Sequence, residues 1–425
     1  MLSLSDVLNN ILEKLHEPVS LLLLQLLIIL IVSRAFGLLF KKLNQPTVIG
    51  EIVAGIVIGV SGLGMLFPEI FNYLFPEKSY IYLEILSKLG LALFMFIIGI
   101  ELDLHLFKQQ SRKVITLSIS SIVVPCITGF FLYSFLYHAY GTIKISYFVF
   151  VAFIAISLSI TAFPVLARII SARGMGSQSI GKLALSCAAV ADLLNWCLLS
   201  IVVAMAKAGS LQAAIPTIVF AFIFIVLMAF VVRPWLRKIL LSPTSKSTGN
   251  YKLLVVAFIL LLFSALCAEI IGLHILFGAF LAGVIMPRNE EFTIELTSKI
   301  EAISVHLFLP VFFAFNGLRL QIIWLNVFSL WTLFIIIIVA MLGKFLGSLL
   351  PAKWVGLPTA DALRLGALMN TRGLMELVVL NIGLEAGILS TEIFTLFVLM
   401  AILTTLATNP LLDLIDKFAK RKEFN

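Results

Sequence analysis

Long apolar stretches separated by short polar segments follow one another along almost the whole chain. About 20 apolar residues, rising roughly 1.5 Å each in a helix, are enough to cross the hydrocarbon core of a bilayer. The pattern predicts an all-α polytopic membrane protein with about thirteen transmembrane helices. The expected spans are residues 19–40, 47–65, 82–100, 114–137, 146–170, 180–206, 213–236, 251–271, 273–287, 302–317, 325–349, 360–382 and 392–415.

Composition and charge agree with a membrane protein that has little soluble mass. The 425 residues are 61% hydrophobic and 12% charged, against about 45–50% and 25% in a soluble domain. The net charge of +8 comes from Lys and Arg in short loops on alternate sides of the spans, which argues for topology signals and against nucleic acid as a partner. By the positive-inside rule, we expect a multi-pass protein of the cell membrane with its N-terminus outside and its C-terminus in the cytoplasm.

Two short motifs recur seven spans later. Gly50–Gly55 resembles Gly278–Gly283, and Phe96–Leu102 resembles Phe313–Leu320 with one residue of slippage. An odd offset makes the two copies point in opposite directions, which predicts inverted-topology repeats; chance similarity of Gly- and Ala-rich helices is the alternative. The expected parts are a first repeat, a linker helix with a cytoplasmic loop, and a second repeat, at residues 1–207, 208–250 and 251–425.

Transporters built on such repeats often break a helix at matching places in both halves. The fifth span contains Ser157 and, a few residues on, Pro164, which lacks an N–H and clashes with the preceding turn. The twelfth span, seven later, contains the polar run Met369–Gly373. Irregular backbone at this depth lines a cavity or is buried in protein, so we predict two broken crossing helices. A proline kink in one span and a buried Arg in the other are the alternative.

Asp192 lies near the middle of the sixth span, with Ala188, Ala189 and Asn195 on its face of the helix. A charge at that depth costs at least about 2.5–3.5 kcal/mol, so it needs a reason to be there. One interpretation is a structural charge paired inside the bundle. The other is a site that binds and releases a monovalent cation or a proton during transport.

Further charges fall inside or at the ends of spans, at Lys344, Arg372, Glu376 and Glu101. Lys344 and Arg372 are the expected counter-charges for Asp192, while Glu376 follows Arg372 by one turn and can pair with it. Desolvation favours the protonated form of a buried carboxylate and a nearby cation favours the charged form, so the two effects oppose each other.

Backbone carbonyls freed around the first break are hard oxygen ligands suited to Na⁺ or K⁺, and Arg372 is expected near the exposed carbonyls of its own broken helix. No cofactor is expected. The cation-binding set predicted beside Asp192 and Asn195 is the run of Ile160, Thr161 and Ala162, and the supporting residues are Glu101, Pro164, Ser157, Arg319, Asn370 and Glu376.

At these residues the chain resembles the membrane domain of the monovalent cation:proton antiporter-2 family, which includes bacterial Na⁺/H⁺ and K⁺/H⁺ antiporters and plant cation/proton exchangers. The matching stretches cover nearly the whole chain: Gln45–Glu51 with the glycines to Gly64, Gly99–Asp103, Ser159–Arg168, Ala188–Asp192, Gly343–Lys344 and Met369–Glu376.

The resemblance implies a sodium/proton antiporter-like fold. It implies that Asp192 is the acid that binds cation and proton alternately, that Thr161 belongs to the unwound segment beside it, and that Lys344 and Arg372 are the basic residues near it. It also implies a homodimer in the lipid bilayer with an elevator-like movement.

The chain departs from the family pattern at Ala191, because relatives usually carry Asp, Asn or Gln before the essential acid. An acid pair is associated with electrogenic exchange, so its absence favours one proton per cation. We therefore expect an antiporter rather than an enzyme, exchanging Na⁺ or K⁺ for H⁺ at Asp192. A channel-like K⁺ efflux protein on the same fold, a non-transporting membrane scaffold or sensor, and a sodium-coupled organic-acid symporter are the alternatives.

Overall fold

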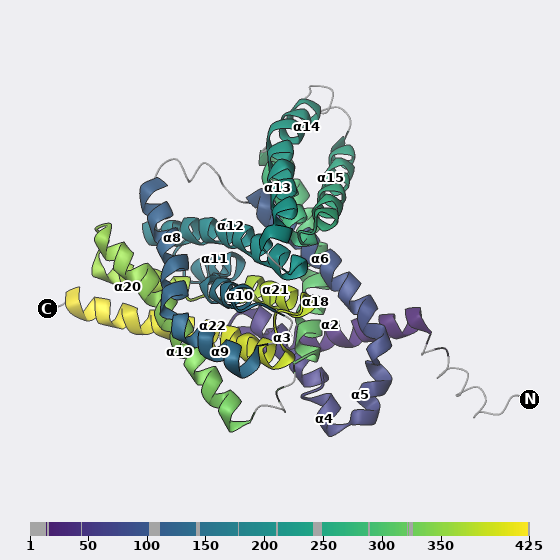
Figure 1. Cartoon of the computed structure of the whole chain (residues 1–425), viewed down its shortest axis with the longest axis horizontal. Coiled ribbons are helices and arrows are strands. Elements are labelled where there is room, and N and C mark those ends of the chain that lie inside the picture. The colour runs from purple at the N-terminus through teal and green to yellow at the C-terminus, as the bar shows by residue number, and fades with distance from the viewer. Residues whose placement is uncertain are drawn as a thin grey trace, which may run out of the picture. The chain divides into compact units, whose positions relative to one another are not determined.

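The protein is described by a computed structural model, shown in Figure 1, in which all regular secondary structure of the described residues is helical. Two compact units form, Met1–Phe94 with Glu295–Ile323 and Met95–Ile294 with Trp324–Asn425. The structure describes residues 14, 17–43, 45–101, 111–141, 145–176, 178–209, 211–240, 249–287, 290–320, 322 and 326–423.

In the first unit, α2 packs on α3, and α18 packs on both. The helices of this unit are α2 (Pro18–Lys42), α3 (Thr47–Ile58), α4 (Leu63–Leu66), α5 (Pro68–Leu74) and α18 (Leu309–Leu318), with the larger parts of α6 (Tyr80–Glu101) and α17 (Glu290–Ile303).

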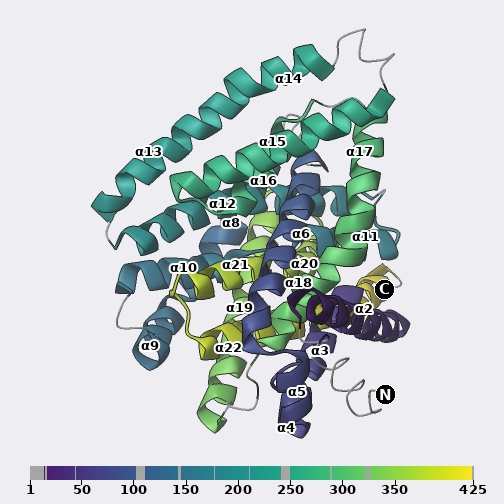
Figure 2. The same cartoon turned by 90° about the vertical axis from the view of Figure 1, so that its right-hand side faces the viewer.

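The second unit holds the remaining helices. In Figures 1 and 2, α13 and α14 run on from each other beside α15, joined by a π-helical turn at Met228–Val232. The helices are α8 (Ser111–Thr128), α9 (Phe130–Tyr140), α10 (Tyr147–Ser159), α11 (Phe163–Ala172), α12 (Ser179–Ala208), α13 (Leu211–Leu227), α14 (Arg233–Leu240), α15 (Gly249–Ile271), α16 (Ile275–Ile285), α19 (Val327–Trp354), α20 (Thr359–Met369), α21 (Leu374–Glu385) and α22 (Thr391–Glu423).

Each of the thirteen predicted spans falls on one helix or on consecutive helices. Among the described residues, nine helices are long and apolar enough to cross a membrane, or ten when α8 and α9, which meet at a bend of 54°, count as one span. The other three expected spans are the short helix α16 and the two broken helices α10–α11 and α20–α21. The expectation of an all-α membrane protein with two broken helices is confirmed.

Packing inside the second unit follows the seven-span repeat. The fourth span, α8, packs against α10 and α12, and its counterpart α19 packs against α20 and α22. The broken pair α10–α11 contacts α12 just as the broken pair α20–α21 contacts α22. Equivalent helices therefore have equivalent neighbours, which chance similarity of two glycine motifs would not produce.

The repeated glycines form close helix crossings within each unit. In the first unit, a Cβ on Gly55 would overlap the backbone of Ala314, so α3 and α18 meet backbone to backbone. In the second unit, a Cβ on Gly283 would overlap the carbonyl oxygen of Phe96, so α16 meets the end of α6 in the same way. Small residues allow this approach between membrane helices, where dispersion contacts replace the hydrophobic effect.

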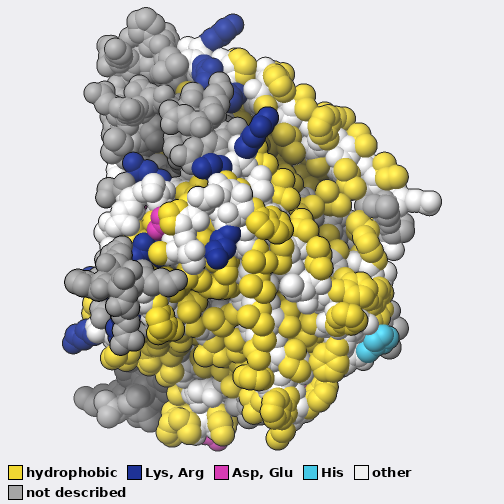
Figure 3. Space-filling model, turned by 90° about the vertical axis from the view of Figure 1, so that its left-hand side faces the viewer, with side chains coloured by type: hydrophobic (Ala, Val, Ile, Leu, Met, Phe, Trp, Pro, Cys, Tyr) yellow, Lys and Arg dark blue, Asp and Glu magenta, His cyan; other side chains and the backbone are white. Residues whose placement is uncertain are grey.

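The face of the protein shown in Figure 3 is covered largely by hydrophobic side chains, with Lys and Arg along its top and left side. Large side chains such as Phe131, Trp331 and Phe334 are exposed on α9 and α19. An apolar surface of this extent is stable only against lipid or another apolar partner. The exposed side chains thus support the membrane setting that the hydropathy pattern predicts.

We expect Gly283→Ala to destabilise the protein by roughly 1–3 kcal/mol, because the new methyl must push α16 away from the carbonyl of Phe96. The midpoint of thermal unfolding in detergent measures this effect. Gly176→Ala is the matched control, since nothing lies within 4 Å of a Cβ at that position. Equal midpoints for the two variants would contradict the close crossing.

Candidate functional site

Two breaks in the helices lie at the centre of the second unit. α10 ends at Ser159 and α11 begins at Phe163, so Ile160, Thr161 and Ala162 form a buried non-helical link. Pro164 is the second residue of α11, where a missing N–H costs nothing because the first N–H groups of a helix have no intrahelical partner. The proline therefore starts a new helix after the break.

The second break is the link Asn370–Gly373 between α20 and α21. Gly373 has φ +149°, a backbone conformation that residues with a Cβ rarely adopt. Hydrogen bonds join the two breaks. The N–H of Ala162 donates to the carbonyl of Thr371 at 2.9 Å, and the Thr161 hydroxyl donates to the carbonyl of Met369 at 3.2 Å. Backbone groups that the broken helices leave free thus find partners across the crossing.

Arg372 is fully buried and caps the end of α10. Its guanidinium donates to the carbonyls of Ser157 at 3.1 Å and Leu158 at 2.7 Å, and it pairs with Glu376 at 3.0 Å. The last carbonyls of a helix lack intrahelical partners and carry the negative end of its dipole, so a cation is favoured there. The expectation that Arg372 lies near the carbonyls of its own broken helix is wrong, because those it contacts belong to the first break.

Thr405 on α22 is a residue of this centre that the sequence interpretation missed. Its hydroxyl donates to the carbonyl of Arg372 at 2.8 Å and accepts from the N–H of Arg372 at 3.1 Å. The available signal was a pair of adjacent threonines, Thr404 and Thr405, in a span that also contains Thr395 and Thr408. Threonine is common in apolar helices, where its hydroxyl bonds to the preceding turn, so the pair alone did not indicate a site.

Asp192 on α12 contacts the backbone at the start of α11. Thr405 on α22 contacts the backbone just before the start of α21 in the same way. The carboxylate of Asp192 accepts a hydrogen bond from the N–H of Phe163. Its side chain is buried, and its Oδ2 atom has no hydrogen-bond partner among the described residues. A buried carboxylate oxygen without a partner is costly, because it has lost its contacts with water and gained none in the protein.

A small cavity adjoins this carboxylate. Its volume of about 10 Å³ corresponds to about one water molecule or a small bare ion. Asn195 borders it and is held in place by the Ser159 hydroxyl, which donates to the amide oxygen of Asn195 at 2.9 Å. The lining residues are Ile160, Asp192, Asn195, Trp196, Leu199, Met375 and Val379, which come from α12, the first break and α21.

Lys344 is fully buried on α19, and its ammonium group has no hydrogen-bond partner in the described part of the chain. It lies within electrostatic range of Asp192 and Glu376. No ion pair within 4.0 Å between Lys344 and Asp192 is found among the described residues. The two buried ionisable groups therefore lie within electrostatic range of each other without direct contact.

The remaining predicted residues divide into two groups. Ile160, Ala162, Ser157 and Glu376 belong to the crossing described above, and Asn370 ties it to α19 through a hydrogen bond of 3.3 Å from its amide to the carbonyl of Met341.

Arg319 belongs to the other unit, where it lies 3.9 Å from Glu84 and 4.7 Å from the ring centre of Phe315. Glu101 is the last residue of α6, but its side chain, like that of Pro164, lies outside the described part.

We expect Arg372→Met to destabilise the protein by about 3–5 kcal/mol, because it leaves the buried carboxylate of Glu376 and two carbonyls unpaired. The double variant Arg372→Met/Glu376→Met should recover part of that loss, since the lone charge is gone. Thermal unfolding in detergent gives both values. As a control, Arg364→Met removes a partly exposed ion pair with Asp416 and should cost about 1 kcal/mol or less. A double variant as unstable as the single one would contradict this account.

Comparison with known proteins places this geometry in a family. The transmembrane domain described as sodium/hydrogen exchanger matches residues 26–414. The chain is 39% identical over 393 residues to the Na⁺/H⁺ antiporter NhaS4 of Synechocystis, covering 92% of this chain and 96% of that protein.

It is also 37% identical to cation/H⁺ antiporter 17 of Arabidopsis thaliana, covering 96% of this chain and 50% of that protein. Identity to K⁺/H⁺ antiporter 1 of Saccharomyces cerevisiae is 34%, covering 94% of this chain and 47% of that protein. The chain thus spans about half the length of these two longer relatives.

A solved structure, that of the sodium proton antiporter MjNhaP1 of Methanocaldococcus jannaschii at pH 8, shares the fold. The TM-score is 0.63 at 15% sequence identity, covering 89% of this chain and 92% of that one. Fold similarity and a sequence match over most of the chain agree, and we conclude that the chain belongs to the transmembrane sodium/hydrogen exchanger family.

Proposed function

We propose that this chain exchanges a monovalent cation, Na⁺ or K⁺, for H⁺ across a membrane by alternate binding at Asp192. Family membership supports the exchange, as do relatives named as Na⁺/H⁺ and K⁺/H⁺ antiporters. The observation that carries the role of Asp192 is its unpartnered Oδ2 atom beside a cavity of about 10 Å³.

The exchange follows from competition for one carboxylate. A proton satisfies Oδ2 by a covalent O–H bond, and a monovalent cation satisfies it by charge, but the small cavity does not hold both. Asn195 lies in reach as an amide oxygen ligand, and the first break supplies backbone around Ile160. Oxygen ligands of this kind suit hard cations.

The second break holds no carboxylate oxygen without a partner among the described residues, although Asn370 Oδ1, Thr371 Oγ1 and Arg372 Nε lack hydrogen-bond partners there. Arg372 and Glu376 form a buried ion pair there, and Thr405 satisfies the backbone of Arg372. The guanidinium supplies a permanent positive charge at the end of α10, so only the Asp192 side changes its ligand during transport. Lys344, without a hydrogen-bond partner among the described residues, supplies a further positive charge within range of Asp192.

Stoichiometry follows from Ala191. It is buried and neutral, so a single carboxylate carries the exchange and each cation leaves or enters against one proton. We further propose a homodimer in the cell membrane with the N-terminus outside. The exposed apolar side chains of α2, among them Leu23, Leu27 and Ile31, support a lipid or subunit contact on that helix.

Asp192→Asn should abolish cation-dependent proton movement. The amide of Asn does not take up a proton near neutral pH and has no negative charge to attract a cation. Purified protein in proteoliposomes with an internal pH-sensitive dye reports the movement when Na⁺, K⁺ and Li⁺ are added in turn. Asp413→Asn is the control, since that side chain is 64% exposed on α22.

A wild type that passes cations without moving protons would favour the channel, and a fully active Asp192→Asn would favour the scaffold or another carrier site. Proton movement that depends on an organic anion would favour the symporter.

Exchange of one cation for one proton moves no net charge, so its rate should not change with membrane potential. The measurement is the initial rate of dye response in proteoliposomes whose potential is set by an ion that the protein does not carry. A rate that rises several-fold with an imposed potential of 100 mV, which is worth about 2.3 kcal/mol per charge, would show net charge transfer. That outcome would reject the single-carboxylate stoichiometry but leave the exchange itself standing.

A further inference from the structure

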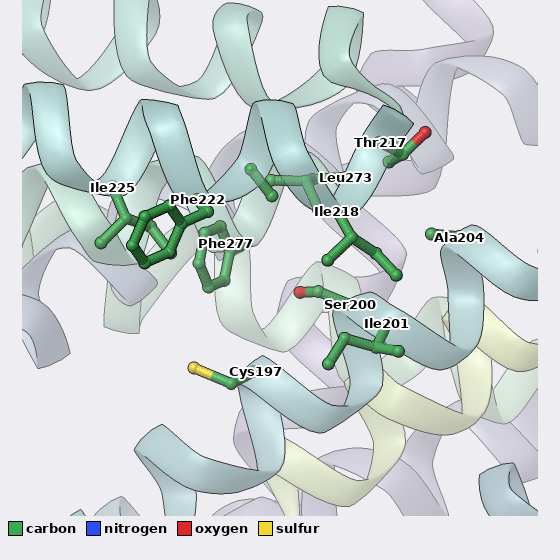
Figure 4. Close-up of a pocket in the computed structure, with 11 residues that line it drawn as sticks. Cys197, Ser200, Ile201, Ala204, Thr217, Ile218, Phe222, Ile225, Leu273 and Phe277 are labelled. Carbon is green, nitrogen blue, oxygen red and sulfur yellow. The ribbon is translucent and has the colours of Figure 1, made fainter. Parts of the chain in front are cut away.

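A second, larger cavity borders another face of the helix that carries Asp192. Figure 4 shows it between α12 and α13, with a volume of about 160 Å³. Side chains of α12 border it from one side and side chains of α13 from the other, while Leu273 and Phe277 line it from the start of α16. We call this cavity the α12–α13 groove.

The lining of the groove suits hydrocarbon rather than water. The hydroxyl of Ser200 already donates to the carbonyl of Trp196 at 2.8 Å, so its hydrogen is not available to a water molecule. Ala204, Ile218, Ala221 and Ile225 are apolar. A buried water needs two to four polar partners, whereas a dry apolar cavity of about 150 Å³ accommodates a hydrocarbon of about benzene size.

The groove opens to the membrane side of α13. Cys197 and Ile201 line the groove from α12 and are exposed, and the face of α13 turned away from the groove carries exposed apolar side chains such as Val219 and Ile223. Phe222 both lines the groove and is exposed. Surface of this kind faces acyl chains in a bilayer, so a chain segment from the surrounding lipid reaches the groove without crossing a polar layer.

A cation stands at the end of the groove where α12 ends. Lys207 is exposed and follows Ala204 by three residues, so it extends the face of α12 that lines the groove. Lysines at the ends of membrane helices direct their ammonium groups toward the headgroup layer. The order along α12 is therefore apolar groove, then positive charge at the interface, which matches an acyl chain followed by an anionic headgroup.

We propose that the α12–α13 groove is a binding site for an anionic phospholipid, with one acyl chain between the two helices and the phosphate at Lys207. The site lies on a different face of α12 from the Asp192 cavity, about 130° around the helix axis at roughly 100° per residue. Asn195, Trp196 and Leu199 border that cavity, whereas Cys197 and Ile201 border the groove. One helix thus separates the lipid from the carboxylate.

The test is native mass spectrometry of the purified full chain in detergent, titrated with phosphatidylglycerol and separately with phosphatidylcholine. Wild type should bind one phosphatidylglycerol more tightly than phosphatidylcholine. Lys207→Gln should weaken phosphatidylglycerol binding about fivefold, the effect of one lysine near a charged headgroup, and should leave phosphatidylcholine binding unchanged. Ala221→Phe, which fills the groove, should remove the bound lipid of both kinds.

Val219→Phe is the matched control, because it enlarges an exposed side chain on the same helix outside the groove and should bind lipid like wild type. Equal lipid binding by Ala221→Phe and Val219→Phe would overturn the proposal, as would phosphatidylglycerol binding that is unchanged in Lys207→Gln. Should Ala221→Phe fail to fold, Lys207→Gln decides alone. Lipid binding is measured without transport, so failure here leaves the proposed exchange untouched.

Discussion

The cap that Arg372 places on the end of α10 is the interaction on which the centre of the second unit depends. Breaking a helix inside a bilayer exposes carbonyls and N–H groups where no bulk water satisfies them, and each unsatisfied group costs several kcal/mol. The guanidinium satisfies the carbonyls of Ser157 and Leu158 with two well-formed hydrogen bonds. Glu376 then neutralises the buried positive charge of the Arg372 guanidinium.

Arg372 and Glu376 make the two inverted repeats chemically different, although the helices of the two repeats are packed alike. At the start of α21, the hydroxyl of Thr405 bonds to backbone of Arg372, and both of its hydrogen bonds are internal. At the start of α11, the equivalent position on α12 holds Asp192, and one of its oxygens lacks a partner among the described residues. The start of α21 therefore has a hydroxyl whose two hydrogen bonds are internal, and the start of α11 has a carboxylate oxygen without a partner among the described residues. The proposed exchange of one cation for one proton at Asp192 rests on this inequality.

Much of the fold was predictable because the bilayer imposes it. Hydropathy alone located all thirteen spans, since every helix must satisfy its own backbone and present apolar side chains to lipid. Both breaks were also predictable, the first from Pro164 and the second from the polar run at Asn370–Gly373. The Arg372–Glu376 pair followed from their spacing of four residues, although Arg372 lies in the break and only Glu376 lies on α21.

What stayed hidden were contacts between residues far apart in the chain. Arg372 lies more than 200 residues from the carbonyls it caps, and spacing rules reach only one or two turns. For the same reason, the sequence named Lys344 as a counter-charge for Asp192 without giving their distance, and the two groups form no ion pair among the described residues. A side chain of this length can point to several neighbouring helices, and packing selects among them.

The position of α12 links the two sites physically. One face carries Asp192 beside a cavity of about 10 Å³, and the other borders a groove of about 160 Å³. Packed interiors transmit small displacements because they have few voids. An empty void of this size beside α12 would leave room for the helix to move without displacing its neighbours. An acyl chain in the groove would fill that space, so a sideways shift of α12 towards α13 would be opposed by contact with the chain. If the groove binds a lipid and Asp192 binds the cation as proposed, an occupied groove would limit the sideways movement of the helix that carries Asp192.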